Sequence, residues 1–360
     1  LAHTVKCPNC GADLPLSPNW RLDKDENIAV RPPYTEAKDN EPGEFGTFEI
    51  INTETTSFDP TDGTISYGDA SCHCDWTIEG EEIKEQAKSE TGLGERVIAI
   101  MTEDDSGRRF VTPSDRDQSA IEEAQKMVKN GGQELKTLLN ADIPSGEKTE
   151  ELRRNGMTEW RDLYTDRQLL AHYHYWKAFE DVKKEVNEEY SEDEAKAILT
   201  YLAFVADKAV DYNSRLSWWD NSIPKIAHCF DRHDFAFKWS FAENNLLAEG
   251  LGYEWTLGNV TKAYRKFREF ASGNMGEAMV KESDAADLDH IDDNEIDALV
   301  VDPPYYQNVM YSELSDYFYI WLRKYLGDVY PGQFDSELTN KGDQAVARAS
   351  DFDDNDKDLS

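Results

Sequence analysis

The sequence predicts an α/β protein in which a β-rich module, a largely helical segment and a strand–turn–helix unit follow one another. Three observations lead to this prediction. Cysteine pairs stand at both ends of residues 1–82, a stretch rich in Pro, Gly, Asp and Thr. Apolar residues take a helical spacing from residue 119, and a short apolar run, Ile296–Val301, ends at two prolines. We divide the chain into a β-rich module (1–82), a short β segment (83–118), a mainly helical part (119–290), the strand–turn–helix unit (291–330) and an irregular or truncated tail (331–360).

The charge is unusual, because 73 acidic residues face 38 basic ones and the net charge is −35. The acidic residues are spread along the whole chain. They are either the surface of an unusually acidic mesophilic protein or an adaptation to a cytoplasm of very high salt, where self-repulsion is screened within ~3 Å at 1 M. We favour the second interpretation, a halophilic protein of haloarchaeal type. Since no apolar run approaches the ~18 residues of a membrane span, and no signal peptide is apparent, we expect a cytoplasmic protein without a membrane partner.

The β-rich module opens with Cys7-Pro8-Asn9-Cys10 and closes with Cys72-His73-Cys74. Two such pairs are typical of a zinc ribbon, in which thiolates from two knuckles close a tetrahedral site. We therefore predict a zinc-ribbon-like module with a structural zinc ion held by Cys7, Cys10, Cys72 and Cys74. The second pair has one intervening residue instead of two, and the gap between the pairs is long, so reduced thiols in two metal-free turns are the alternative. An odd total of five cysteines does not suggest a disulfide framework.

The short β segment contains the apolar run Val97–Met101 and a second stretch, Gly107–Val111. Between them stand the acidic residues 103–105 and a serine, which predicts two strands joined by a hairpin. Gly92 and Gly94 precede a strand, whereas the glycines of a cofactor-binding loop follow one. We therefore predict no cofactor loop here.

The helical part shows three capping-box patterns, at Ser119–Glu122, Thr165–Gln168 and Ser191–Glu194. The third opens a long helix that ends in a polar and aromatic cluster, residues 211–220. Asn213 and Arg215 in this cluster, beside two tryptophans, are predicted to contact nucleic acid, since stacking and guanidinium contacts suit unpaired bases. Ordinary packing of the two tryptophans is the alternative.

A further helix is predicted around residues 260–270, with an inward stripe formed by Val260, Ala263, Phe267 and Phe270. Its other face carries the densest basic cluster of the chain. A solvated face is the default interpretation of such a cluster, but in so acidic a chain it is also the best candidate for phosphate contact. The cluster consists of Lys262, Arg265, Lys266 and Arg268.

The run Ile296–Val301 predicts a buried parallel strand, and Asp302-Pro303-Pro304-Tyr305 follows it directly. Consecutive prolines forbid both a strand ladder and a helix, so the backbone is stiff and its carbonyls are free. A carboxylate, a carbonyl and an aromatic ring would thus stand at the end of a strand, where α/β sheets place ligands. Leu314, Phe318, Trp321, Leu322 and Tyr325 then predict a helix that ends at Gly327.

These residue types suit the methylation of an exocyclic amino group. Asp302 can accept one N–H of the amino group and the Pro303 carbonyl can accept the other, while Pro304 keeps the turn rigid. Tyr305 can stack on the base, which must be flipped out of any duplex to reach such a turn. Tyr306 would form a wall of the pocket and Asn308 would orient the base or the loop. Most of the rate would come from positioning.

Residues 302–305 resemble the Asp-Pro-Pro-Tyr motif of N6-adenine and N4-cytosine amino-methyltransferases. The longer string to Arg323 is similar to the large prokaryotic adenine-specific DNA methylases that carry an N-terminal domain of unknown function. The resemblance extends to the first cysteine pair and to residues 94–96, 165–170 and 212–214. It implies S-adenosyl-L-methionine (AdoMet) as cofactor, a Rossmann-like methyltransferase domain present in part, DNA as partner and substrate, and a restriction-modification or phage-defence setting with other subunits.

Two departures from this family lead us to expect a fragment. The glycine-rich AdoMet loop should lie upstream of the first cysteines, and the strands that complete the sheet should follow the chain; neither is found. The cysteine module and the helices would then be an insertion for target recognition. Two alternatives stay open: a non-catalytic nucleic-acid-binding or scaffold component of a defence system, and an amino-methyltransferase that acts on cytosine N4, RNA or protein glutamine.

Overall fold

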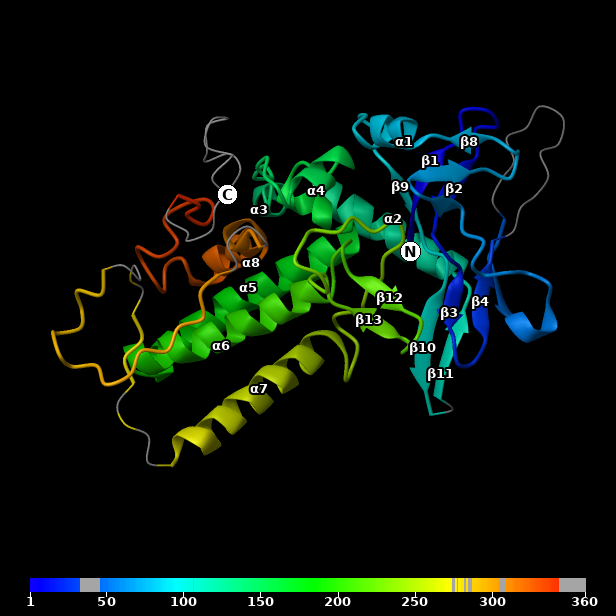
Figure 1. The fold of residues 1–360 in the computed structure, drawn as a ribbon. Coiled ribbons are helices and arrows are strands. Elements are labelled where there is room, and N and C mark those ends of the chain that lie inside the picture. The colour runs from blue at the N-terminus through cyan, green and yellow to red at the C-terminus, as the bar shows by residue number, and fades with distance from the viewer. Residues whose placement is uncertain are drawn as a thin grey trace, which may run out of the picture.

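Figure 1 shows the computed structural model, in which a β-rich part lies beside a group of long helices. The structure describes residues 1–32, 46–105, 107–273, 276, 278–281, 283, 287–304 and 309–342. These residues form a mixed α/β fold with eight α-helices and five small sheets. Every strand pair in the described part is antiparallel, so the parallel sheet expected of a Rossmann-like domain is not among these residues.

The cysteine module is built from two short sheets. Strand β1 (Ala2–Lys6) is central in the first and pairs with β2 (Asp13–Leu16) and β9 (Gly94–Arg96). The second sheet contains β6 (Ile65–Ser66), β7 (Asp69–Ser71) and β8 (Thr77–Ile78), and helix α1 (Gly80–Ala87) follows it. Their apolar side chains form one small core, which consists of Val5, Ala12, Leu14, Leu16, Ile65, Ala70, Ile78, Ile83 and two of the cysteines.

A third sheet is inserted between the two cysteine pairs, and it accounts for the long gap between them. It contains β3 (Arg21–Asp23), β4 (Ile28–Arg31) and β5 (Glu49–Asn52), with the short 3-10 helix η1 (Thr53–Thr55) behind β5. The predicted acidic hairpin is confirmed as β10 (Ile100–Asp104) and β11 (Gly107–Val111).

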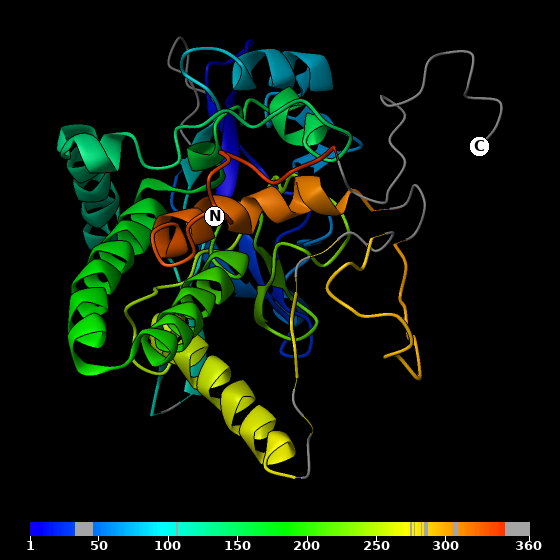
Figure 2. The same cartoon turned by 90° about the vertical axis from the view of Figure 1, so that its left-hand side faces the viewer.

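Helices make up most of the regular secondary structure in the remaining described residues. The elements are α2 (Asp115–Asn130), α3 (Gln133–Lys136), α4 (Glu150–Arg154), η2 (Trp160–Leu163), α5 (Asp166–Glu189), α6 (Glu192–Asp211), the hairpin of β12 (Trp218–Asp220) and β13 (Lys225–Ala227), α7 (Gly252–Ala271) and α8 (Tyr311–Leu326). Helices α5 and α6 lie side by side, and α8 packs against both, as Figure 2 shows from the side. None of the described helices is both long and apolar enough to cross a membrane.

Helix α8 is anchored in the core by its aromatic side chains. The Trp321 indole N–H donates to the Tyr164 hydroxyl (2.9 Å), and the Tyr317 hydroxyl donates to the carbonyl of Val210 (2.7 Å). The described part of the tail, residues 331–342, contains no helix or strand. It is nevertheless tied to α8, because buried Asp316 accepts from Thr339 and pairs with Lys341.

Two of the three predicted capping boxes are confirmed. Thr165 caps α5 and Ser191 caps α6. The box at Ser119 is wrong, because α2 begins at Asp115 with Ser114 as its cap and Asp117 completing the box. A serine followed three residues later by an acidic residue occurs twice in succession here, and the earlier site starts the helix. Ser119 then lies inside it and bonds to the carbonyl of Asp115.

Two predictions of burial are wrong. Residues 296–301 form no strand, and Leu299, Val300 and Val301 are 74%, 93% and 70% exposed. A β-strand needs a neighbouring strand to pair its backbone N–H and C=O groups, and no described strand runs beside residues 296–301. In α7, the predicted inward residues Ala263, Phe267 and Phe270 are exposed, because the C-terminal half of the helix runs away from α6 (Figure 1).

Candidate functional site

The structure brings the four predicted metal ligands together. The Sγ atoms of Cys7, Cys10, Cys72 and Cys74 all lie within 4.8 Å of one another. Cys7 Sγ lies 3.7 Å from Cys74 Sγ, and Cys10 Sγ lies 3.6 Å from Cys72 Sγ. A disulfide would need about 2.05 Å, whereas thiolates about 2.3 Å from one zinc ion at tetrahedral angles lie about 3.8 Å apart. The cluster therefore has the geometry of a four-cysteine metal site.

Tight turns hold the two cysteine pairs in place. Between β1 and β2, the Gly11 N–H donates to the carbonyl of Cys7, and Gly11 adopts a positive φ of 73° that suits glycine. Between β7 and β8, the Cys72 N–H donates to the carbonyl of Trp76. Each pair is thus fixed by its own hairpin, and the small core beneath sets the distance between the two.

The four thiols differ in how readily they ionise. Burial raises the pKa of Cys10 and of Cys72. Burial also acts to raise the pKa of Cys74. The Asn9 amide, 3.4 Å from its sulfur, and the Trp76 backbone N–H stabilise the thiolate, however, and together they lower the pKa of Cys74 to about 7. Since a thiolate is the form that binds metal, Cys74 is the most readily available ligand.

The Asp-Pro-Pro-Tyr turn lies at the surface, as far as it is described. Asp302 and Pro303 are exposed and Pro304 is half-buried. Tyr305, Tyr306 and Asn308 lie outside the described residues. The chain then enters α8, which is firmly packed.

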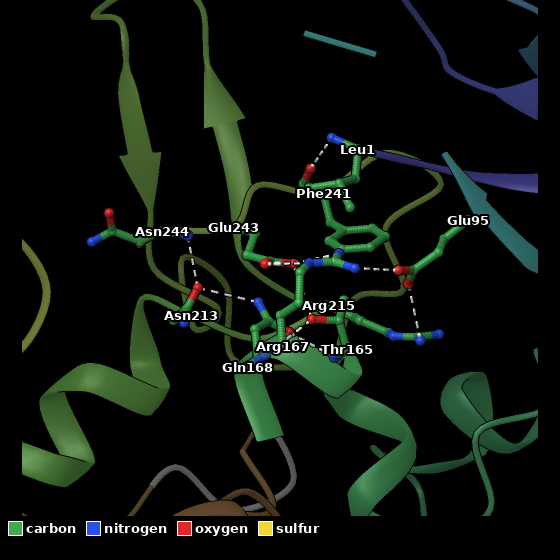
Figure 3. Close-up of polar contacts among 10 residues, drawn as sticks. All are labelled: Leu1, Glu95, Thr165, Arg167, Gln168, Asn213, Arg215, Phe241, Glu243 and Asn244. Atoms are coloured by element: carbon green, nitrogen blue, oxygen red, sulfur yellow. Dashed lines mark hydrogen bonds and ion pairs between the residues drawn. The ribbon is translucent and has the colours of Figure 1, made fainter. Parts of the chain in front are cut away.

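A network of half-buried ion pairs joins the cysteine module to the helices (Figure 3). Arg167, near the start of α5, binds Glu243 with two of its nitrogens, at 2.7 and 2.8 Å, and binds Glu95 of β9 at 3.0 Å. Arg215 binds the other oxygen of Glu95 at 3.2 Å, and the Thr165 hydroxyl donates to Glu243. These four charged side chains are 15 to 23% exposed. Two arginines and two carboxylates compensate one another, so the network is neutral.

Asn213 lies next to this network and is 1% exposed. Its Oδ1 accepts two hydrogen bonds, from the Asn244 backbone N–H (2.8 Å) and from Gln168 Nε2 (3.2 Å). The orientation of both amides follows, because Gln168 Oε1 in turn accepts the backbone N–H of Thr165. The Nδ2 of Asn213 is buried and has no hydrogen-bond partner.

From the sequence we predicted that Asn213 and Arg215 are presented to nucleic acid. In the structure Asn213 is buried and Arg215 is half-buried in the ion-pair network. Segments 165–168, 213–215 and 239–245 meet here with β9. Asn213, but not Arg215, stands in the wall of a cleft of about 1400 Å³ that is lined by strands β3, β4, β10 and β11 together with helices α2 and α5. Glu95, Arg167 and Glu243 were not predicted as a group, since the sequence does not reveal the pairing of charges that lie 72 and 76 positions apart.

All four residues of the basic cluster on α7, namely Lys262, Arg265, Lys266 and Arg268, are exposed. None of them forms an ion pair with another described residue. The exposed rings of Phe267 and Phe270 lie on the same part of the helix. This surface therefore offers free positive charge and aromatic rings side by side.

Comparison of the chain with protein-family models, with curated proteins and with solved structures found no match. The methyltransferase assignment therefore stays a prediction that rests on residues 302–305 and the segments around them. The four-cysteine cluster and the cleft are the sites whose geometry the described residues define.

His172 provides a pH-dependent prediction. Burial lowers its pKa to about 4, although a bond to the Asn213 carbonyl acts against this, and its Nδ1 lies 2.8 Å from the Tyr253 hydroxyl. Between the ordinary pKa of about 6.5 and pH 4, the unfolded chain binds more protons than the folded one, so stability should fall as the pH falls. His172→Gln should reduce the slope of unfolding free energy against pH by up to about 1.4 kcal/mol per pH unit in this window. Urea unfolding between pH 4 and 7 measures the slope; exposed His174→Gln should leave it unchanged, and equal slopes for both variants would contradict the role of His172.

Proposed function

We propose that the chain is the base-holding part of an AdoMet-dependent methyltransferase that acts on the exocyclic N6 amino group of adenine in DNA. The observation that carries this proposal is the string Asp302-Pro303-Pro304-Tyr305 a few residues before α8. Because α8 is fixed in the core through Tyr317 and Trp321, a rigid helix follows the turn closely. The exposed positions of Asp302 and Pro303 leave both acceptors accessible to a substrate.

The proposed work of these residues is to hold and activate an amino group. The nitrogen lone pair of adenine N6 is delocalised into the ring. If Asp302 accepts one N–H and the Pro303 carbonyl accepts the other, the two acceptors draw the nitrogen toward tetrahedral geometry and direct its lone pair. The base must leave the duplex to reach them. Tyr305 is proposed to stack on the base.

The described residues do not fit AdoMet. The sheets they form are antiparallel, and none of these strands leads through a glycine-rich turn into a helix, as an AdoMet site requires. We therefore propose that residues outside the described ranges, or another subunit of a modification or defence system, hold the methyl donor.

We further propose that the four-cysteine cluster binds one zinc ion. Four thiolate ligands leave no open position on the metal, so its role would be structural. The cysteine module and the helices would then present the surfaces that recognise DNA, with Lys262, Arg265 and Lys266 of α7 in contact with phosphate.

The test is methyl transfer from labelled AdoMet to DNA in molar KCl, with the chain alone and with the chain together with the other subunits proposed to hold the methyl donor. Asp302→Ala should abolish incorporation of label at adenine. Asp297→Ala is the matched control, because this aspartate is also exposed and lies five positions before Asp302; it should keep full activity. Absence of Asp302-dependent label in both preparations would rule out the proposed activity.

Removal of positive charge from α7 should weaken DNA binding. The triple variant Lys262→Gln, Arg265→Gln and Lys266→Gln should lose at least about tenfold in affinity, and the slope of log K against log salt should fall by about 2 to 3. Titration of labelled duplex at several KCl concentrations measures both quantities. Arg116, Lys126 and Lys129 on α2, three exposed basic residues changed to Gln, form the control. Equal losses in the two variants would show that α7 is not a specific contact.

A non-catalytic nucleic-acid-binding or scaffold component is the second candidate. The exposure of residues 296–301 and the lack of a fit for AdoMet among the described residues favour it. DNA binding that depends on α7 without any label that depends on Asp302 would identify this candidate.

A further inference from the structure

Helix α7 is packed against the rest of the molecule over its N-terminal half only. Thr256 in this half is buried, and the Tyr264 ring packs on Tyr201 of α6 with the ring centroids 5.2 Å apart. Beyond Tyr264 the helix continues for about two turns, and there it runs away from α6 (Figure 1). Phe267 and Phe270 stand on these turns and are 59% and 74% exposed. An anchored helix thus carries two phenylalanine rings into solvent.

Basic side chains stand beside the two rings. Residues three or four positions apart are neighbours on the surface of a helix, with Cβ atoms about 5–6 Å apart. Phe267 and Phe270 form such a pair. Lys266 stands four positions before Phe270, and Lys262 stands four positions before Lys266. Both lysines are exposed, so a row of positive charge leads along the helix to the rings.

The charge of this segment is opposite to that of the chain as a whole. Residues 262–270 contain four basic residues and one acidic residue, Glu269, whereas acidic residues outnumber basic ones by 73 to 38 in the full sequence. A polyanion is repelled by most of such a surface and is attracted here. The C-terminal half of α7 is therefore complementary in charge to a phosphate backbone.

The exposed rings indicate which form of nucleic acid fits. In a duplex the faces of the bases are covered by stacking, and a protein reaches mainly their edges through the grooves. In a single strand the faces are accessible, and an aromatic side chain can stack on any of them. A single strand thus uses the rings and the cations of α7 together, whereas a duplex would use the cations and leave the rings without stacking partners.

A second copy of the chain fits this surface less well. Its acidic surface could pair with the cations of α7, but it would leave the two phenylalanine rings without apolar or aromatic contact. Each copy also carries a net charge of −35, so two copies repel one another unless salt screens them.

We propose that the C-terminal half of α7 binds single-stranded DNA, with Phe267 and Phe270 stacked on successive bases and the cations of the helix on the phosphates between them. The choice of DNA rests on the proposed function, while the preference for an unpaired strand rests on the rings and charges of α7. In molar salt counterion release contributes little, so stacking carries most of the affinity. Such a surface would hold a strand that is already open near a base that has left the duplex.

Titration of the full chain in molar KCl with labelled oligothymidine, and with a duplex that contains the same strand, tests the proposal. The single strand should bind at least about tenfold more tightly than the duplex. The double variant Phe267→Leu and Phe270→Leu should lower the affinity for the single strand by about tenfold, because leucine keeps apolar surface but has no ring to stack on a base. This loss should be equally large in dilute and in molar KCl, since stacking is not screened by salt.

Phe204→Leu is the matched control. Phe204 is also an exposed phenylalanine on a helix, because it lies on α6 and is 45% exposed. This variant should bind the single strand like the parent protein. Thermal melting of both leucine variants should match that of the parent, which separates loss of binding from loss of fold.

Three results would overturn the proposal. The first is binding of the single strand by the folded parent protein that is absent, or no tighter than binding of the duplex. The second is an unchanged affinity for the single strand in the double leucine variant. The third is a dimer, seen by sedimentation, that this variant abolishes, which would assign the rings to a second copy. Tighter binding of oligouridine than of oligothymidine would contradict the choice of DNA. None of these measurements involves methyl transfer, so failure here and failure of the proposed activity can be told apart.

Discussion

Substitution of Cys72 by serine is expected to lower the melting temperature of the zinc-loaded protein by roughly 10 °C or more. The four sulfur atoms lie within 4.8 Å of one another, and Cys72 is 5% exposed and belongs to the small core of the cysteine module. That core is made of short strands and few side chains, so most of its stability should come from the metal. Removal of one thiolate would weaken both the binding of the metal and the packing of this core.

Thermal melts with and without a strong chelator measure this effect, and elemental analysis should find about one zinc ion per chain. Cys229→Ser provides the control, because Cys229 is also buried in a core but lies outside the cluster, and its thiol donates to Asp211. Serine can keep that hydrogen bond, so the change in melting temperature should be small. If elemental analysis finds no zinc and the chelator leaves the melting temperature unchanged, the four cysteines are reduced thiols that bind no metal.

Replacement of Arg167 by methionine is expected to cost about 3–5 kcal/mol of unfolding free energy. Arg167 is 19% exposed and, among the described residues, is the one that binds both Glu95 and Glu243, which are 16% and 15% exposed. Methionine would leave Glu243 without its two-nitrogen partner and Glu95 with Arg215 alone. Arg167→Lys should lie between the parent and the methionine variant, since lysine cannot bind both oxygens of a carboxylate in the same plane.

Urea unfolding gives the free energies, and Arg154→Met is the matched control. Arg154 also pairs with a glutamate, Glu150 at 3.1 Å, but its side chain is 63% exposed. Exposed pairs contribute little, so this variant should lie within about 0.5 kcal/mol of the parent. If Arg167→Met and Arg154→Met lose the same unfolding free energy, the lower exposure of the network does not increase its contribution to stability.

Features that depend on neighbouring residues could be predicted from the sequence. The caps at Thr165 and Ser191, the β10–β11 hairpin and helix α8 each follow from a pattern within a few residues, and all are confirmed. The prediction at Ser119 was wrong because a second, equally local pattern started the helix earlier.

Features that depend on distant residues were harder to predict. The four cysteines could be grouped because the chemistry of thiolates is distinctive at any separation. The apolar run at residues 296–301 predicted a buried strand, but burial requires a sheet beside it, which the described residues do not provide. Asn213 and Arg215 were predicted to contact nucleic acid, and only the fold shows that Arg215 binds Glu95 and that buried Asn213 accepts from Gln168.

The central position of β1 has a consequence for folding during synthesis. β1 pairs with β9, and at its start the His3 N–H donates to the carbonyl of Trp239, while the carbonyl of Leu1, the residue before β1, accepts from the Phe241 N–H. A distance of 240 positions along the chain separates Leu1 from Phe241, so at 5–20 residues per second roughly 10 to 50 s of translation pass before this edge is covered. The four cysteines, in contrast, have all been made by residue 74. If the cysteines bind a metal at this stage, the metal would order the cysteine module and protect its thiols from oxidation before Trp239 and Phe241 are synthesised.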